Sequence, residues 1–134
     1  MAEIFSGIYL IFNCADPGSV MAVTSDDGAS VGMVDFADGG PRQQWRFDGL
    51  GDGVYVVFNQ GSNMPLVLDK PSEGGQAECG FSDLLWTIDG DSERSPIVYD
   101  GMALTPTNGQ GGWKLTLLPQ NGADIQQWRF LSVG

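Results

Sequence analysis

Short apolar segments, separated by turn-forming residues, run along the whole chain, and two of them are near copies of each other. They are Gly7–Asn13 (GIYLIFN) and Gly53–Asn59 (GVYVVFN), and Pro96–Asp100 (PIVYD) is a fainter copy. Aromatic and β-branched residues favour strands, and the clusters ADPGS and QGSN, which follow the first two segments, favour turns. No segment shows sustained helical periodicity with caps. The pattern therefore predicts an all-β protein.

Two further short apolar segments follow each of these strands. The second strands are predicted at Met21–Val23, Leu66–Leu68 and Met102–Leu104, and the third strands at Val31–Val34, Ala77–Cys79 and Lys114–Leu118. Glycine, proline, serine and aspartate cluster between them, as turns require. Each unit thus has three predicted strands ahead of a fourth strand, which contains a tryptophan.

A tryptophan motif closes each unit. Gln43–Phe47 (QQWRF) is identical to Gln126–Phe130, and Leu84–Ile88 (LLWTI) is a weaker copy. The tryptophans are 41 and 42 residues apart. Because they recur at one place in each unit, we expect all three to lie in a shared core: Trp45, Trp86 and Trp128.

Three units of about 41 to 46 residues, at 5–50, 51–90 and 91–134, fill the chain. One such unit cannot bury its apolar face alone, whereas three units around a pseudo-threefold axis share a core and close a barrel without free edges. A propeller has blades of similar period but needs at least about four of them. The repeat therefore predicts a single all-β domain with the β-trefoil fold, built from three pseudo-symmetric four-stranded repeats.

The residue types present exclude several kinds of chemistry. The chain has 134 residues, enough for one domain, and no histidine, which excludes histidine-based nucleophile systems and His-ligated zinc. A formal net charge of −11, from 17 acidic and 6 basic residues, disfavours nucleic acid and anionic membrane surfaces as partners. The sequence has no D-x-D-x-D-G calcium loop, and we expect neither a metal nor a cofactor.

The chain also lacks the sequence features of export and membrane insertion. It has no apolar run approaching about 18 residues, and its first residues, MAEIFSGIYLIFN, show no basic region ahead of an apolar run. These observations predict a soluble, cytoplasmic protein. Cys14 and Cys79 are expected to be small apolar fillers, and a single bridge between them is possible.

The Q-x-W motif that ends a unit is similar to the motif of the ricin-B-like β-trefoil lectins. It stands here as Gln43–Trp45 and Gln126–Trp128, with Leu84–Trp86 as a degenerate copy. The opening GIYLIFN strand resembles the cytosolic mushroom branch of that family. The resemblance covers essentially the whole chain. It implies a carbohydrate-binding protein without enzymatic activity, with a defensive role and with glycans or glycoproteins as partners, galactose-type sugars by default.

In that family, three kinds of residue form the sugar site of each unit. The aspartate of the second strand corresponds here to Ala22, Val67 and Ala103, the polar residue before the motif to Arg42, Asp83 and Ile125, and the stacking aromatic to Phe36, Phe81 and Trp113. Because no residue of the first set can accept a hydrogen bond from a sugar hydroxyl, the resemblance implies remodelled or degenerate sites in all three units.

Neighbouring residues offer replacements for the missing aspartate. In the first unit, Asp35 or Asp38 would supply the carboxylate and Phe36 the stacking ring, near Arg42 and Gln43. In the second unit, Asp69 lies on the same strand face as Val67, and Phe81 and Asp83 follow. In the third unit, the candidates are Trp113, Asn121 and Asp124. A solvated acidic loop is the alternative for each cluster, and core packing is the alternative for Trp113. Gln43 and Gln126 are expected to hydrogen-bond turn backbone rather than a ligand.

A second class of function remains open. β-Trefoils that resemble this chain include protease inhibitors, which present an exposed loop to the enzyme. The Gly/Pro-rich segments Asp69–Glu78 and Thr105–Gly112 suit that function. The sequence favours a glycan-binding lectin, with protease inhibition through a loop as the alternative.

Overall fold

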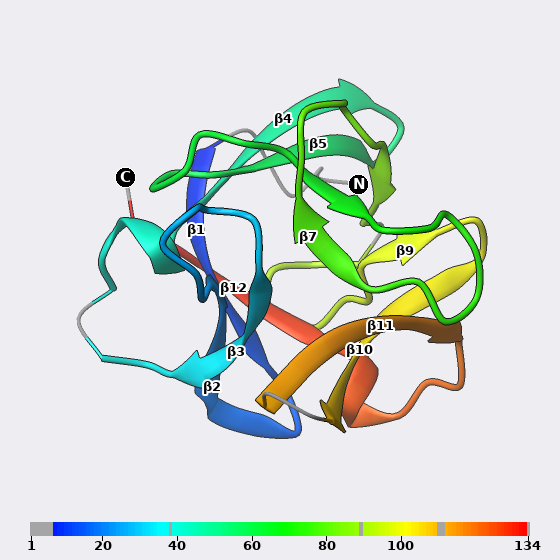
Figure 1. The fold of residues 1–134 in the computed structure, drawn as a ribbon. Helices are drawn as coiled ribbons and strands as arrows, with labels where there is room; N and C mark the ends of the chain where they lie inside the picture. Colours follow the sequence, from blue (N-terminus) through cyan, green and yellow to red (C-terminus); the bar gives the residue numbers. More distant parts are fainter. Residues whose placement is uncertain (1–6, 38, 89, 110–111, 134) are drawn as a thin grey trace.

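β-Strands make up nearly all of the regular secondary structure in a computed structural model that describes residues 7–37, 39–88, 90–109 and 112–133 (Figure 1). The strands are β1 (Gly7–Asn13), β2 (Asp16–Val23), β3 (Val31–Asp35), β4 (Trp45–Gly51), β5 (Val54–Asn59), β6 (Leu66–Leu68), β7 (Ala77–Cys79), β8 (Trp86–Thr87), β9 (Val98–Tyr99), β10 (Met102–Gly109), β11 (Gly112–Pro119) and β12 (Trp128–Ser132). Two 3-10 helices, η1 (Pro41–Gln43) and η2 (Asp124–Gln126), precede β4 and β12. The all-β prediction is confirmed.

Six of the strands form a barrel. Strands β1, β4, β5, β8 and β9 pair in that order, all antiparallel, and β12 pairs with the other side of β1. A bridge between Ser95 and Trp128 links the segment before β9 to β12 and so brings the two ends of this sheet together. Pairing around a ring leaves few free strand edges.

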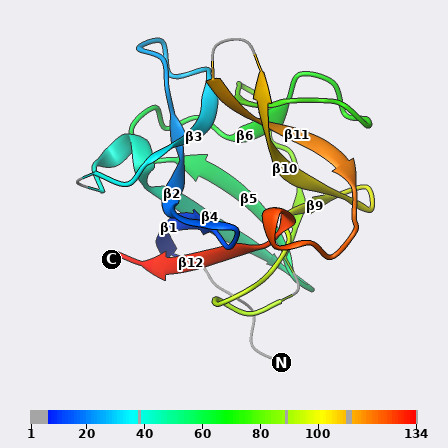
Figure 2. The ribbon, with the colours of Figure 1, turned by 90° about the horizontal axis from the view of Figure 1, so that it is seen from below.

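Three hairpins, β2–β3, β6–β7 and β10–β11, pack at one end of the barrel (Figure 2). They meet around a common centre through equivalent backbone contacts. The Cys79 amide donates to the Ala29 carbonyl and the Leu117 amide to the Gly75 carbonyl, both at 2.8 Å. At the third contact the Trp113 carbonyl lies against Gly32. Six barrel strands with three hairpins in threefold arrangement are the β-trefoil architecture that the repeat predicted.

The three motif tryptophans lie at the centre of the core and are fully buried, as predicted. Two of them also hydrogen-bond the second strand of their own unit: the Trp45 indole donates to the Met21 carbonyl and the Trp86 indole to the Leu66 carbonyl, both at 2.9 Å. Apolar side chains from all three units surround them. Because the three units share this core, one unit alone would leave much of its apolar surface exposed to water.

The third unit differs from its prediction. Residues 105–109 extend β10 and residue 112 begins β11, so most of the predicted loop Thr105–Gly112 is a long hairpin. In the first unit β2 begins at Asp16, inside the predicted turn ADPGS. Both segments contain proline, which weakens a strand signal in a sequence.

Both cysteines are free thiols, so the possible bridge between them is not formed. Cys79 is buried as a small filler, whereas Cys14 is half-buried. Among the described residues, no helix is long and apolar enough to span a bilayer.

Candidate functional site

A cavity of about 440 Å³ lies between the first and third units, where β3 faces the β10–β11 hairpin. We call it the Trp113 pocket. Its polar side chains are Asn13, Asp16, Ser19 and Asp35, its apolar walls are Met33, Val34, Pro106 and Ile125, and the indole of Trp113 lines it as well. Residues about 100 positions apart in the chain meet here because the threefold packing sets the first hairpin beside the third.

The β1–β2 turn and the β2–β3 hairpin place the carboxylates. Ser19 and Asp35 are direct partners across β2 and β3, so both side chains stand on the same face of the hairpin. The Ser19 hydroxyl donates to Oδ2 of Asp16 at 2.7 Å, which fixes that carboxylate at the rim. The two acids therefore come from the two strands at the open end of one hairpin, Asp16 from β2 and Asp35 from β3, and share one cavity.

Asn13 joins the two units at the floor of the pocket. Its Oδ1 accepts the Ala15 amide at 2.9 Å, and its Nδ2 donates to the Ile125 carbonyl at 2.9 Å. The side chain is buried, and both of its polar atoms are satisfied within the protein. Its role in the pocket is to hold the β1–β2 turn against η2.

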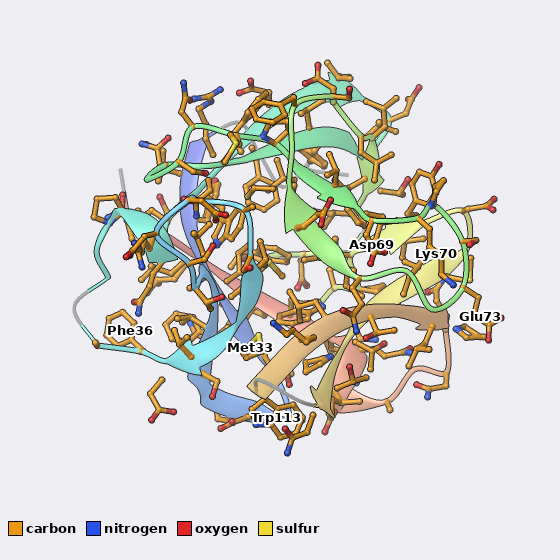
Figure 3. All side chains as sticks on the ribbon, in the orientation of Figure 1. Met33, Phe36, Asp69, Lys70, Glu73 and Trp113 are labelled. Carbon is orange, nitrogen blue, oxygen red and sulfur yellow. The ribbon has the colours of Figure 1, made fainter. Side chains whose placement is uncertain are left out.

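Trp113 is the one tryptophan of the four that lies outside the buried core. It is 47% exposed, whereas the other three tryptophans are fully buried, so the core-packing alternative for this residue is wrong. It pairs with Asn108 near the tip of the β10–β11 hairpin. Figure 3 shows its side chain where β11 starts, on the side of β2, with Met33 nearby. A half-exposed indole in a cavity wall is a surface on which the C–H face of a sugar can stack.

In the first unit the predicted cluster divides. Asp35 lines the Trp113 pocket, but Phe36 packs on Phe12 with ring centroids 5.6 Å apart and lies away from Trp113 (Figure 3). Consecutive residues of an extended chain point to opposite faces, which explains the separation. Asp38 lies outside the described residues.

Arg42 and Gln43 also lie apart from the Trp113 pocket. The Arg42 guanidinium pairs with Asp26 at 2.6 Å beside a separate cavity of about 330 Å³. There a hydrogen bond from the Ser25 hydroxyl lowers the pKa of Asp27. Gln43 is buried, and no described residue hydrogen-bonds its Oε1.

In the second unit Phe81 and Asp83 share a groove of about 600 Å³ with Val67, which we call the Phe81 groove. The Phe81 ring is 95% exposed. Burial raises the pKa of the Cys79 thiol in the same groove to about 11, so this thiol is protonated near neutral pH. Asp69 does not join them, because its carboxylate accepts the Gln76 amide at 2.8 Å and closes the loop between β6 and β7.

In the third unit the predicted polar residues hold the loop ahead of β12. Asn121 Oδ1 accepts the Ala123 amide, and Asp124 pairs with Arg94 at 2.6 Å. Neither side chain lines the Trp113 pocket. Trp113 is therefore brought to Asp35 of the first unit and not to the acids of its own unit.

Gln126 binds turn backbone, as predicted. Its Nε2 donates to the Pro119 carbonyl at 2.9 Å and to Oγ1 of Thr105 at 3.1 Å, and its Oε1 accepts the Asn121 amide at 2.9 Å.

The strand register corrects one correspondence. Ala22 pairs with Gly32, Val67 with Glu78, and Thr105 with Thr116, and these three pairs occupy equivalent places around the hairpin centre. The third-unit equivalent of Ala22 and Val67 is therefore Thr105 and not Ala103. Thr105 can accept a hydrogen bond, but its hydroxyl is buried and already bonded within the protein.

Sequence reasoning missed Asp16, Ser19 and Asn13 as pocket residues. Asp16 and Ser19 flank Pro17 and Gly18, a composition that favours a turn in the sequence, although the structure places all four residues in β2. That composition gives no information about Trp113, which reaches these residues only through the tertiary fold.

No protein-family model matches the sequence, and no curated protein sequence matches it either. Solved structures do match. The ricin B-like lectin of Macrolepiota procera in complex with lactose is 19% identical, with a TM-score of 0.81 over 98% of this chain and 100% of that one. The Rhizoctonia solani agglutinin is 16% identical, with a TM-score of 0.83 over 99% of both chains.

A designed threefold-symmetric protein, ThreeFoil, is 27% identical to the chain, with a TM-score of 0.80 over 95% of this chain and 99% of that one. The likeness to a protein designed with threefold symmetry agrees with the three sequence repeats. The chain therefore has the β-trefoil fold, with a structure similar to those of the ricin B-like lectins.

Proposed function

We propose that this protein is a carbohydrate-binding protein and that the Trp113 pocket is its binding site. The observation that carries the proposal is one cavity that contains two carboxylates, Asp16 and Asp35, and a half-exposed indole. Sugars present hydroxyl donors to carboxylates and an apolar C–H face to aromatic rings. Similarity to lectin structures, one of them solved with lactose, supports the same function.

The pocket differs from the sites that the family resemblance implies. It lies at the junction of two units, and the positions of the missing family aspartate, Ala22 and Thr105, are buried. We therefore propose a remodelled site in which Asp35 supplies the carboxylate and Trp113 the stacking face.

A glycan array at physiological salt, probed with the parent and with Trp113→Ala, tests this function. We expect the parent to bind at least one glycan family with competable signal and Trp113→Ala to lose about tenfold or more in affinity, because the stacking face is removed. Phe81→Ala is the matched control, since it removes an exposed aromatic ring outside the pocket. A blank array would contradict the function, and binding lost only in Phe81→Ala would move the site to the Phe81 groove.

The geometry of the Asp69–Glu78 loop weighs against inhibition of a protease in the manner of a substrate. The Lys70 carbonyl accepts the Ser72 amide at 2.9 Å and faces Gly75 inside the loop. A substrate-like inhibitor must offer the carbonyl of its reactive bond to the enzyme's oxyanion hole. The Lys70 side chain is exposed, but its carbonyl faces Gly75 inside the loop and is not presented to an enzyme.

A further inference from the structure

We infer that the Trp113 pocket prefers glycans with a free amino group, that is, unacetylated 2-amino sugars, over their N-acetylated counterparts and over acidic glycans. The inference rests on the proposed function and adds the class of sugar. Three properties of the pocket lead to it: the kind of polar atom left free, the absence of a counter-charge, and the aromatic wall.

The polar atoms left free in the pocket are mainly acceptors. Both polar atoms of Asn13 are bonded within the protein, and the Ser19 hydroxyl donates to one oxygen of Asp16. Among the described residues none donates a hydrogen bond to the side chain of Asp35. A ligand must therefore bring the donors, and an ammonium group brings three of them together with a positive charge.

No described residue places a counter-ion for these carboxylates in the pocket. All six lysines and arginines lie in the described part of the chain, and none of them lines the cavity. Arg42 and Arg94 are paired with acids elsewhere, and Arg129 lies over the Phe12 ring. The negative field of Asp16 and Asp35, within a chain of net charge −11, attracts a cationic sugar and repels a carboxylated or sulfated one.

The aromatic wall suits the same ligand. The face of an indole attracts both sugar C–H groups and a cation, and tryptophan is the best side chain for the second interaction. Trp113 exposes about half of its surface beside the apolar walls Met33 and Pro106. An amino sugar can thus place its ring on these apolar surfaces and direct its ammonium group to Asp35.

Calorimetric titration of the intact protein with three probes tests the inference: a glucosamine tetramer, its fully N-acetylated counterpart, and sialyllactose. We expect the unacetylated tetramer to bind about tenfold more tightly than the acetylated one, and sialyllactose to bind most weakly. The preference should shrink between about 0.1 M and 1 M NaCl, because the screening length falls from about 10 Å to 3 Å.

Asp35→Asn isolates the charge. We expect it to weaken binding of the unacetylated tetramer about fivefold and to change binding of the acetylated tetramer less than about twofold. Asp52→Asn is the matched control: it makes the same charge change at the exposed β4–β5 turn, where the φ of 57° suits asparagine as well as aspartate. It should leave both affinities unchanged.

The outcomes separate the two proposals. Equal binding of both tetramers that is lost in Trp113→Ala would overturn the amino-sugar preference and leave the proposed function standing. The amino-sugar preference of the pocket would also be overturned if the unacetylated tetramer still bound both Asp35→Asn and Trp113→Ala. The attraction would then come from the acidic surface as a whole and not from the pocket. Absence of binding to all three probes overturns the preference, and the glycan array decides the function.

Discussion

At the scale of single residues, the repeated motif shows that equal sequence does not give equal roles. Gln43 and Gln126 stand at the same place in identical QQWRF segments. Gln126 makes three hydrogen bonds that hold the turn before β12, whereas Oε1 of Gln43 is buried without a partner among the described residues. The same divergence affects the tryptophans, because the Trp128 indole nitrogen has no described acceptor while those of Trp45 and Trp86 do.

The first prediction compares the two glutamines. Gln126→Met should lower the free energy of unfolding by about 2–3 kcal/mol, because the Asn121 amide and the Pro119 carbonyl lose their partner. Gln43→Met, of nearly the same shape, should cost less than about 0.5 kcal/mol or stabilise the protein, because it removes a buried oxygen that no described residue hydrogen-bonds. Urea unfolding of both variants measures the difference. Equal losses would show that Gln43 has a polar role similar to that of Gln126.

At the scale of strands and hairpins, the pocket depends on how closely β3 approaches β11. A Cβ on Gly32 would collide with the backbone carbonyl of Trp113. The equivalent positions in the other units hold Glu78 and Thr116, so the very close approach belongs to the first and third units alone. The absence of a side chain at Gly32 thus allows the backbone of Trp113 to lie directly against β3.

The second prediction follows from this contact. Gly32→Ala should destabilise the protein by about 1–3 kcal/mol, because a backbone atom must move to make room. It should also shift the fluorescence emission of Trp113, the exposed tryptophan, while the three buried tryptophans keep their signal. Thermal unfolding monitored by fluorescence measures both effects. Gly18→Ala is the matched control, because a Cβ at Gly18 meets no atom within 4 Å.

The elements also show how far a sequence alone can lead. Core strands such as β1 and β5 were predictable, because each is a run of aromatic and β-branched residues that is followed by turn-forming residues. The extension of β10 was not, because the segment TPTN is polar and contains proline. The pairing of Asp35 with Trp113 was not predictable either, because it arises where two units meet rather than within one unit.

At the scale of the whole molecule, charge opposes compactness. The net charge is −11, and among the described residues the three ion pairs are all at the surface. Surface pairs of this kind contribute little, so mutual repulsion of the acids is the larger effect. The buried tryptophan core must therefore offset a repulsion that depends on ionic strength.

The third prediction is that the melting temperature rises by several degrees between about 10 mM and 200 mM NaCl, because salt screens the repulsion. Differential scanning calorimetry of the parent measures the slope. The double variant Asp52→Asn and Asp100→Asn should flatten it, since both sites are exposed turns at positive φ where asparagine is tolerated. A melting temperature that falls with salt would instead show that the surface ion pairs dominate.

The imperfect symmetry of the three hairpins has a consequence for valency. Ala29 and Gly75 occupy the places in the first and second units that Trp113 occupies in the third, as their equivalent backbone contacts show. The aromatic wall is therefore built once in the described chain, although the scaffold offers the place three times. A monomer with one such wall would coat a glycosylated cell without bridging it to a neighbour, and agglutination would require the chains themselves to associate.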